Sequence, residues 1–202
     1  MSDGGALAPD PRWHRFHLGA RPPSLVQARA LEPGGVRRPD VPPRKARHHR
    51  RLLTTLVYLH GFASGPGSTK AQYFRARLAA LGVPLQIPDL APDFTHVTVS
   101  GMLAVVEEIL ARGPTLLFGS SLGGYLAALA ATRRPAQVRG LVLFAPAFGF
   151  AARWETRIGR AALARWRAEG TIPVHHYGHG REVPLDIGLL DDARRYPGEP
   201  DP

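Results

Sequence analysis

A pentapeptide with a serine between two glycines, Gly119-Ser120-Ser121-Leu122-Gly123, constrains this chain more than any other segment. An apolar run, Thr115–Phe118, precedes it, and an alanine-rich stretch, Tyr125–Ala131, follows it. This order predicts a strand, a sharp turn and a helix, with Ser121 at the apex of the turn. The flanking glycines allow neighbouring backbone to come close, and the strained turn pushes the serine hydroxyl outward. We therefore predict that Ser121 is a nucleophile; an ordinary serine in a glycine-rich turn is the alternative.

A second motif, His60-Gly61-Phe62, follows another apolar run, Leu56–Leu59. A turn of this kind at the end of a strand supplies a backbone N–H to an oxyanion hole, the set of donors that stabilises the charged intermediate of acyl transfer. We predict that the donors here are the N–H groups of Phe62 and Leu122. The loop that continues to Lys70 is rich in glycine, but its order Gly-Ser-Thr-Lys differs from the Gly-Lys-Ser/Thr order of a phosphate-binding loop.

Four segments resemble the α/β-hydrolase superfamily in their order along the chain: Leu59–Ser64, Pro88–Leu90, Gly119–Gly124 and Ala145–Ala147. The resemblance covers about residues 54–196 and is closest to small bacterial serine esterases of the uncharacterised-hydrolase type. It implies an acyl-enzyme on Ser121, formed from a small-molecule carboxylic ester or thioester without a cofactor. It also implies that the base follows the serine in the chain. We therefore assign Gly119, Gly123, His60 and Gly61 a supporting role in the two turns.

Strand and helix patterns alternate from Leu52 onward, which predicts an α/β fold with a mostly parallel sheet flanked by helices in three layers. The expected strands cover residues 56–59, 83–87, 115–118 and 140–144, and the expected helices cover residues 69–81, 102–110 and 125–132. After Pro146, aromatic residues and arginines predict a small helical cap over about residues 147–196. Its aromatic residues, which could line a pocket for an acyl or aryl group, are Phe148, Phe150, Trp154 and Trp166.

An acid and a base that would activate Ser121 are not evident in the sequence. The resemblance implies that an acid and then a histidine follow the serine, each after a later strand. Here His175, His176 and His179 precede Asp186, Asp191 and Asp192, which is the reverse order. We therefore expect an incomplete hydrolase domain, with its acid and base beyond residue 202 and weak activity in this chain. A catalytically inactive, hydrolase-like binding domain is the alternative. The histidines and Asp186 match no metal-binding spacing, so no metal site is predicted.

Composition limits the remaining function classes. The chain has 202 residues and a net charge of +10, and residues 1–55 hold 11 Lys and Arg against 4 Asp and Glu. We expect residues 1–50 to be a disordered tail rich in Pro and Arg, and residues 51–202 to be a partial hydrolase domain. The basic run Arg44–Arg51 has no interleaved aromatic residues for base stacking, so nucleic-acid binding is the less favoured alternative. Without cysteine or a membrane-length apolar run, the sequence favours a cytoplasmic protein that makes no contact with a membrane.

Overall fold

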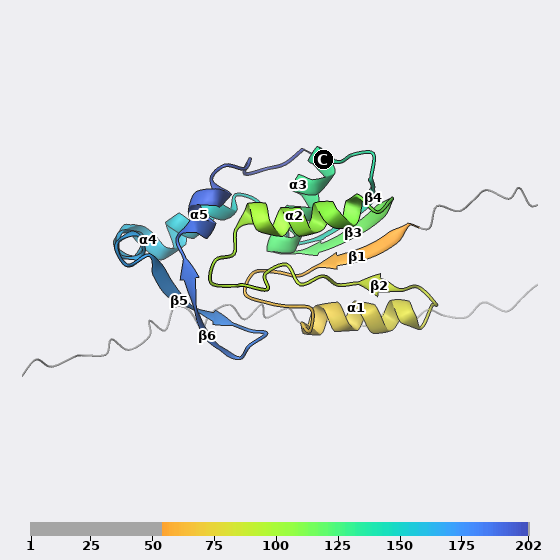
Figure 1. The fold of residues 1–202 in the computed structure, drawn as a ribbon, viewed down its shortest axis with the longest axis horizontal. Helices are drawn as coiled ribbons and strands as arrows, with labels where there is room; N and C mark the ends of the chain where they lie inside the picture. The colour runs from red at the N-terminus through yellow and green to blue at the C-terminus, as the bar shows by residue number, and fades with distance from the viewer. Residues whose placement is uncertain (1–53, 202) are drawn as a thin grey trace, which may run out of the picture. The chain divides into compact units, whose positions relative to one another are not determined.

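The computed structural model describes residues 54–201, so the predicted tail of residues 1–50 lies outside the described residues. The described part contains a four-stranded sheet, a separate two-stranded sheet and the helices around them (Figure 1). The elements in chain order are β1 Thr55–Leu59, α1 Thr69–Ala79, β2 Leu85–Gln86, α2 Val99–Leu110, β3 Thr115–Ser120, α3 Leu122–Arg133, β4 Val138–Phe144, α4 Phe150–Glu169, β5 Thr171–His176, β6 Arg181–Asp186 and α5 Gly188–Ala193. No helix in this range is long and apolar enough to cross a membrane.

The larger sheet is parallel throughout, with strand order β2-β1-β3-β4. Leu59 of β1 pairs with Gly119 of β3, and Ser120 of β3 pairs with Phe144 of β4. The carboxyl ends of these three strands therefore lie at one edge of the sheet, which is where parallel sheets place their binding residues. The predicted parallel sheet is confirmed, although β2 is shorter than predicted and β3 and β4 are longer.

Helices cover both faces of this sheet, as the sequence predicts (Figure 1). The main hydrophobic core lies between one face of the sheet and the helices α2 and α3. Val57 and Leu59 of β1 point into this core. Tyr58 of β1 points to the opposite face and packs with Ala71 of α1. Successive residues of a strand point to opposite faces, so one apolar strand contributes to both layers.

The segment after β4 contains helices, as the sequence predicts, and also a hairpin that the sequence does not predict. α4 is interrupted at Gly159, whose φ of 76° and ψ of 164° are not helical. It is followed by the antiparallel hairpin β5–β6 and the short helix α5. The sequence does not predict this hairpin because Pro173 and Pro184 interrupt its strand patterns. In the structure the two prolines lie opposite each other in the small sheet, apart from the main one.

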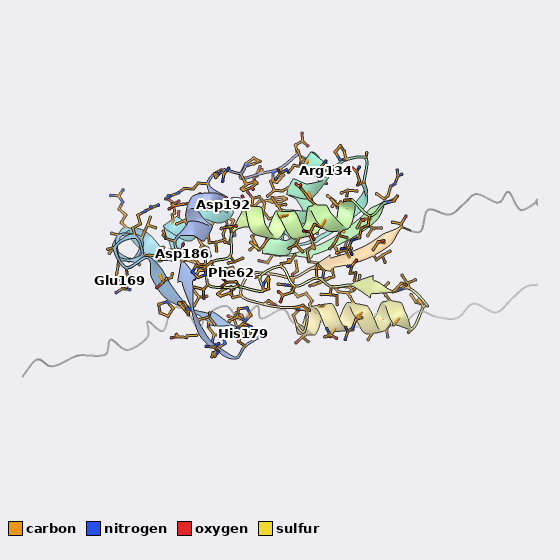
Figure 2. The ribbon with its side chains drawn as sticks, in the orientation of Figure 1. Phe62, Arg134, Glu169, His179, Asp186 and Asp192 are labelled. Carbon is orange, nitrogen blue, oxygen red and sulfur yellow. The ribbon has the colours of Figure 1, made fainter. Side chains whose placement is uncertain are left out.

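A carboxylate from α5 ties this segment to the main domain. Asp192 accepts hydrogen bonds from the Ser100 N–H at 2.7 Å and from the Ser100 hydroxyl at 2.6 Å. Ser100 lies in the first turn of α2, where backbone N–H groups have no partner within the helix. The Asp192 side chain is only 10% exposed and lies beside the start of α2 (Figure 2). It therefore satisfies an N–H in the first turn of a helix that is far from it in the chain, since 92 positions separate Asp192 from Ser100.

We expect Asp192→Ala to lower the free energy of unfolding by about 1–3 kcal/mol, because it leaves the partly buried Ser100 N–H without its acceptor and the Ser100 hydroxyl with Tyr196 as its remaining partner. Urea denaturation followed by circular dichroism measures the change. Glu169→Ala is the matched control, since that carboxylate is exposed on α4 (Figure 2). Equal midpoints for the Asp192 and Glu169 variants would show that this carboxylate does not stabilise the domain.

Candidate active site

Ser121 lies at the apex of the turn between β3 and α3, in a backbone conformation that serine rarely adopts. Its φ is 53° and its ψ is −118°. Hydrogen bonds hold the residue on both sides: its N–H donates to the Phe144 carbonyl at 3.0 Å, and its carbonyl accepts from the N–H groups of Tyr125 at 3.1 Å and Ala147 at 3.0 Å. A conformation of this kind costs about 1–3 kcal/mol and persists only where the surroundings impose it. The end of β4, the segment that follows it and the first turn of α3 therefore hold Ser121 in this conformation.

The two glycines of the pentapeptide occupy positions where a side chain does not fit. A Cβ at Gly119 would lie 2.5 Å from the Gly123 carbonyl oxygen. A Cβ at Gly123 would overlap the Leu59 carbonyl oxygen and lie 2.5 Å from the His60 carbonyl oxygen. These distances are below any that real Cβ atoms tolerate, so glycine is required at both positions. The amino end of α3 thereby packs directly against the end of β1.

The His60-Gly61-Phe62 turn lies beside the pentapeptide, which brings the two predicted halves of the site together. A Cβ built on Gly61 would lie 3.4 Å from the Ser121 Cβ and 3.4 Å from the Ser120 carbonyl oxygen. Leu122 is the first residue of α3, so its N–H has no acceptor within the helix. The N–H groups of Phe62 and Leu122 thus come from turns that are in contact with each other.

His60 is only 3% exposed and uses both ring nitrogens to hold the turn. Its Nδ1 lies 3.0 Å from the Gly61 carbonyl oxygen, and its Nε2 lies 3.3 Å from the Leu90 N–H. These partners assign the proton to Nδ1, which donates, and leave Nε2 as the acceptor. Burial lowers the pKa of His60, while the hydrogen bond to Gly61 and the charge of Asp89 act in the opposite direction. The ring is therefore a neutral link between this turn and the loop at Leu90.

Acidification is expected to destabilise the folded chain through His60. Its pKa is lower in the folded than in the unfolded state, so above about pH 6.5 the ring is neutral in both states. Below that pH the unfolded chain binds a proton that the folded chain excludes. The free energy of unfolding then falls by up to about 1.4 kcal/mol per pH unit until the folded pKa is reached.

Urea midpoints at pH 7.5 and 5.5 measure this effect. His60→Asn should reduce the difference between the two midpoints, whereas the control His175→Asn, which changes an exposed residue of β5, should leave it unchanged. A wild-type chain with the same midpoint at both values would contradict the expectation.

The two serines of the pentapeptide have different surroundings. Ser121 is exposed, whereas Ser120 is only 6% exposed. The Ser120 hydroxyl accepts a hydrogen bond from Lys70 Nζ at 3.1 Å. The sequence does not predict the contact between Lys70 and Ser120, because 50 positions separate the two residues. In the sequence, Lys70 is notable only because it stands at the wrong position for a phosphate-binding loop.

Aromatic side chains surround Phe62, at the end of the sheet that faces the hairpin β5–β6 (Figure 2). Its ring centroid lies 5.1 Å from that of Trp154, 5.4 Å from that of Phe94 and 6.1 Å from that of Phe150. Trp154 and Phe150 belong to α4. The predicted aromatic cluster of the cap therefore contacts the loop that carries the Phe62 N–H. A separate open depression of about 440 Å³ on α4 is lined by Ala152, Arg153, Thr156 and Arg157.

The histidines after Ser121 lie on the hairpin, where their ring contacts are with Phe94, Tyr177 and one another. His176 is 3% exposed, and its ring stacks on His179 at a centroid distance of 3.9 Å. Burial, followed by the charges of His179 and His60, lowers the pKa of His176. Within residues 54–201, the Ser121 hydroxyl has no side-chain hydrogen bond, and no three His, Asp or Glu residues are placed to hold a metal ion.

The acidic residues after Ser121 also have partners elsewhere. Asp191 forms ion pairs with Arg167 and Arg194, both at 2.8 Å. Asp186 accepts a hydrogen bond from the Gly188 N–H at 2.7 Å. With Asp192 bound to Ser100, these three carboxylates are engaged in structural contacts.

Comparison with known proteins places the chain among hydrolase folds. The model of the Uncharacterised protein family (UPF0227) matches residues 55–193. No curated protein matches the chain in sequence.

Solved structures with similar folds include proteins whose titles call them hydrolases. A putative hydrolase from Agrobacterium vitis S4 is 27% identical with a TM-score of 0.61, over 70% of this chain and 60% of that one. Alpha/beta hydrolase domain-containing protein 10 from mouse is 22% identical with a TM-score of 0.57, over the same shares. Est1E from Butyrivibrio proteoclasticus is 18% identical with a TM-score of 0.54, over 72% of this chain and 60% of that one. The chain thus spans 60% of the length of each of these proteins, and the predicted α/β-hydrolase fold is confirmed.

Proposed function

The chain belongs to the uncharacterised protein family UPF0227 and has the fold of the α/β-hydrolases, and from these two facts we propose that it is a serine hydrolase of carboxylic esters or thioesters. The observation that carries the proposal is the exposed Ser121 at a φ of 53°, at the edge where three parallel strands end. A strained serine at this point of an α/β sheet is the arrangement that presents a nucleophile to a substrate.

The reaction we propose has two steps. The Ser121 Oγ attacks the carbonyl carbon of the ester while its proton leaves to a base, and the carbonyl oxygen becomes an oxyanion that accepts hydrogen bonds from the N–H groups of Leu122 and Phe62. The intermediate then collapses, the bond to the alcohol or thiol breaks, and the leaving group takes up a proton. Water attacks the resulting acyl-enzyme, releases the acid and restores the serine hydroxyl.

Two observations support these roles. Gly61 and Ser121 are close enough that a Cβ on the glycine would contact the serine Cβ, so the two N–H donors can converge on one oxygen. His60 is buried and bonded to backbone at both ring nitrogens, which suits it to orienting the turn rather than to accepting the serine proton. The aromatic rings around Phe62 favour an apolar acyl or aryl group on the substrate.

A slow rate is part of the proposal. The side-chain hydrogen bonds of residues 54–201 include none from the Ser121 hydroxyl, so water is left to take its proton. An oxyanion hole and substrate binding without the acid–base pair retain only a residual acceleration, about 10³- to 10⁴-fold over water in serine proteases. The same observation favours the second candidate function, a hydrolase-like domain that binds its ligand without turnover.

Intact-mass spectrometry during reaction with p-nitrophenyl acetate and with an acyl thioester separates the two functions. A hydrolase adds one acyl group to the chain and releases p-nitrophenol or thiol in equal amount, followed by slow turnover. A binding domain leaves the mass unchanged at saturating ester, and that outcome would reject the proposed reaction.

A further inference from the structure

Lys70 reaches the serine turn with its side chain, and nothing in the proposed reaction uses it. It lies in the first turn of α1, and its Nζ donates to the Ser120 hydroxyl at 3.1 Å. We propose that Lys70 is a positioning residue of the oxyanion hole: by bonding to Ser120, it fixes the loop that carries the Phe62 N–H against the turn that carries the Leu122 N–H. This inference rests on the function proposed above.

Several contacts hold the loop from Gly61 to Ser68, among them a hydrogen bond of 2.6 Å from Gln72 Nε2 of α1 to the Pro66 carbonyl. At its start, Gly61 is in contact with Ser121, as described above. In its middle, the Ala63 carbonyl accepts a hydrogen bond from the Tyr177 N–H of the hairpin at 2.8 Å. At its far end the chain enters α1, whose N-cap is Ser68, and two residues later Lys70 bonds to Ser120. Lys70 therefore links the far end of the loop to Ser120, the residue directly before Ser121.

Ser120 is a suitable anchor because it is only 6% exposed. It lies beside Tyr58, which is 1% exposed in the layer between the sheet and α1. Lys70 itself is exposed, and none of the carboxylates in residues 54–201 lies within ion-pair distance of it. No ion pair with a carboxylate of these residues therefore competes with the hydrogen bond from the Lys70 ammonium to Ser120.

We expect the contact between Lys70 and Ser120 to affect the rate of the reaction and not the free energy of unfolding. Stabilisation of an oxyanion depends on donors that are held in place before charge develops. An error of about 1 Å in the position of such a group can slow a reaction about 100-fold. An exposed lysine on the surface of a short helix contributes little to the free energy of unfolding. Loss of the contact should therefore slow attack by Ser121 without lowering the stability of the domain.

Three variants of the full chain test the inference. Lys70→Met removes the donor, Ser120→Ala removes the acceptor, and Lys70→Arg keeps a cationic donor. Arg77→Met, at the exposed far end of α1, is the matched control for lost charge. Each protein is reacted with a fluorophosphonate, whose P=O oxygen mimics the oxyanion, and hydrogen exchange of the amides in residues 61–68 is measured by mass spectrometry.

We expect Lys70→Met and Ser120→Ala each to lower the maximal labelling rate about tenfold or more, with the half-saturating concentration and the melting temperature unchanged. The double variant should be no slower than either single one, because the two changes break the same contact. Exchange in residues 61–68 should rise in both variants, remain normal in Arg77→Met, and be partly restored in Lys70→Arg.

The possible outcomes separate this inference from the proposed function. Unchanged exchange in residues 61–68 of Lys70→Met and Ser120→Ala would overturn the positioning role, whatever the labelling rates. Additive losses in the double variant would also overturn it. If the wild-type chain is labelled no faster than Ser121→Ala while exchange still rises in both variants, the loop is positioned by Lys70 but the proposed reaction fails.

Discussion

Gly123→Ala is expected to keep the chain from reaching its folded state under conditions where the wild type is folded. The added Cβ would overlap the Leu59 carbonyl oxygen and lie 2.5 Å from that of His60. Both oxygens belong to the backbone at the end of β1, so neither can move aside without separating α3 from the sheet. We expect a loss of about 4 kcal/mol or more in the free energy of unfolding, which is a large share of the stability of a domain of this size.

Urea denaturation followed by circular dichroism measures this loss. Gly67→Ala is the matched control, because a Cβ at that exposed glycine of the loop would meet no atom within 4 Å. The control should unfold at nearly the wild-type midpoint. A Gly123→Ala chain that unfolds with the control would mean that α3 does not pack against β1 as closely as the structure has it.

Ser121→Ala is expected to abolish acyl transfer to the chain. No other serine near the turn is exposed at a strained apex, and Ser120 is buried with its hydroxyl bonded to Lys70. No acyl group should therefore be added to the chain, and ester cleavage should lose the part that passes through the acyl-enzyme, leaving only what the oxyanion hole and binding supply. The stability of the variant should be equal or slightly higher, since the change removes only an exposed hydroxyl.

Thr132→Ala serves as the control for loss of a hydroxyl group. Thr132 is exposed near the far end of α3, where its hydroxyl donates to the carbonyls of Ala128 and Asp201. It should cleave esters at the wild-type rate. If the Ser121 and Thr132 variants retain the same rate above background, the nucleophile lies elsewhere in the chain.

Features that are local in the sequence could be predicted from it. The apolar run before Ser121 and the alanine-rich run after it predicted β3 and α3, because strand and helix patterns extend over neighbouring residues. The alternation of strands with helices predicts a parallel sheet, and in the structure the pairing of β1 with β3 in that sheet places the His60 turn beside Ser121. The residues at both turns were therefore predicted to converge, and the geometry has them in contact.

Contacts between distant parts of the chain could not be predicted. The bond from Lys70 to Ser120 depends on how α1 lies on the sheet, and the bond from Asp192 to Ser100 depends on where α5 meets α2. Neither pair has a local pattern. The hairpin β5–β6 was missed for a different reason: proline disfavours strands inside a sheet, but Pro173 and Pro184 lie in a two-stranded sheet in which every strand is an edge.

The most direct test of the account is the site of covalent labelling by a fluorophosphonate. The full chain is incubated with the reagent, digested, and the modified residue is identified by tandem mass spectrometry. We predict a single adduct on Ser121, formed slowly because no described residue accepts its proton. An adduct on Ser120, or no adduct at any concentration that labels an ordinary serine hydrolase, would contradict the assignment of Ser121 as the nucleophile.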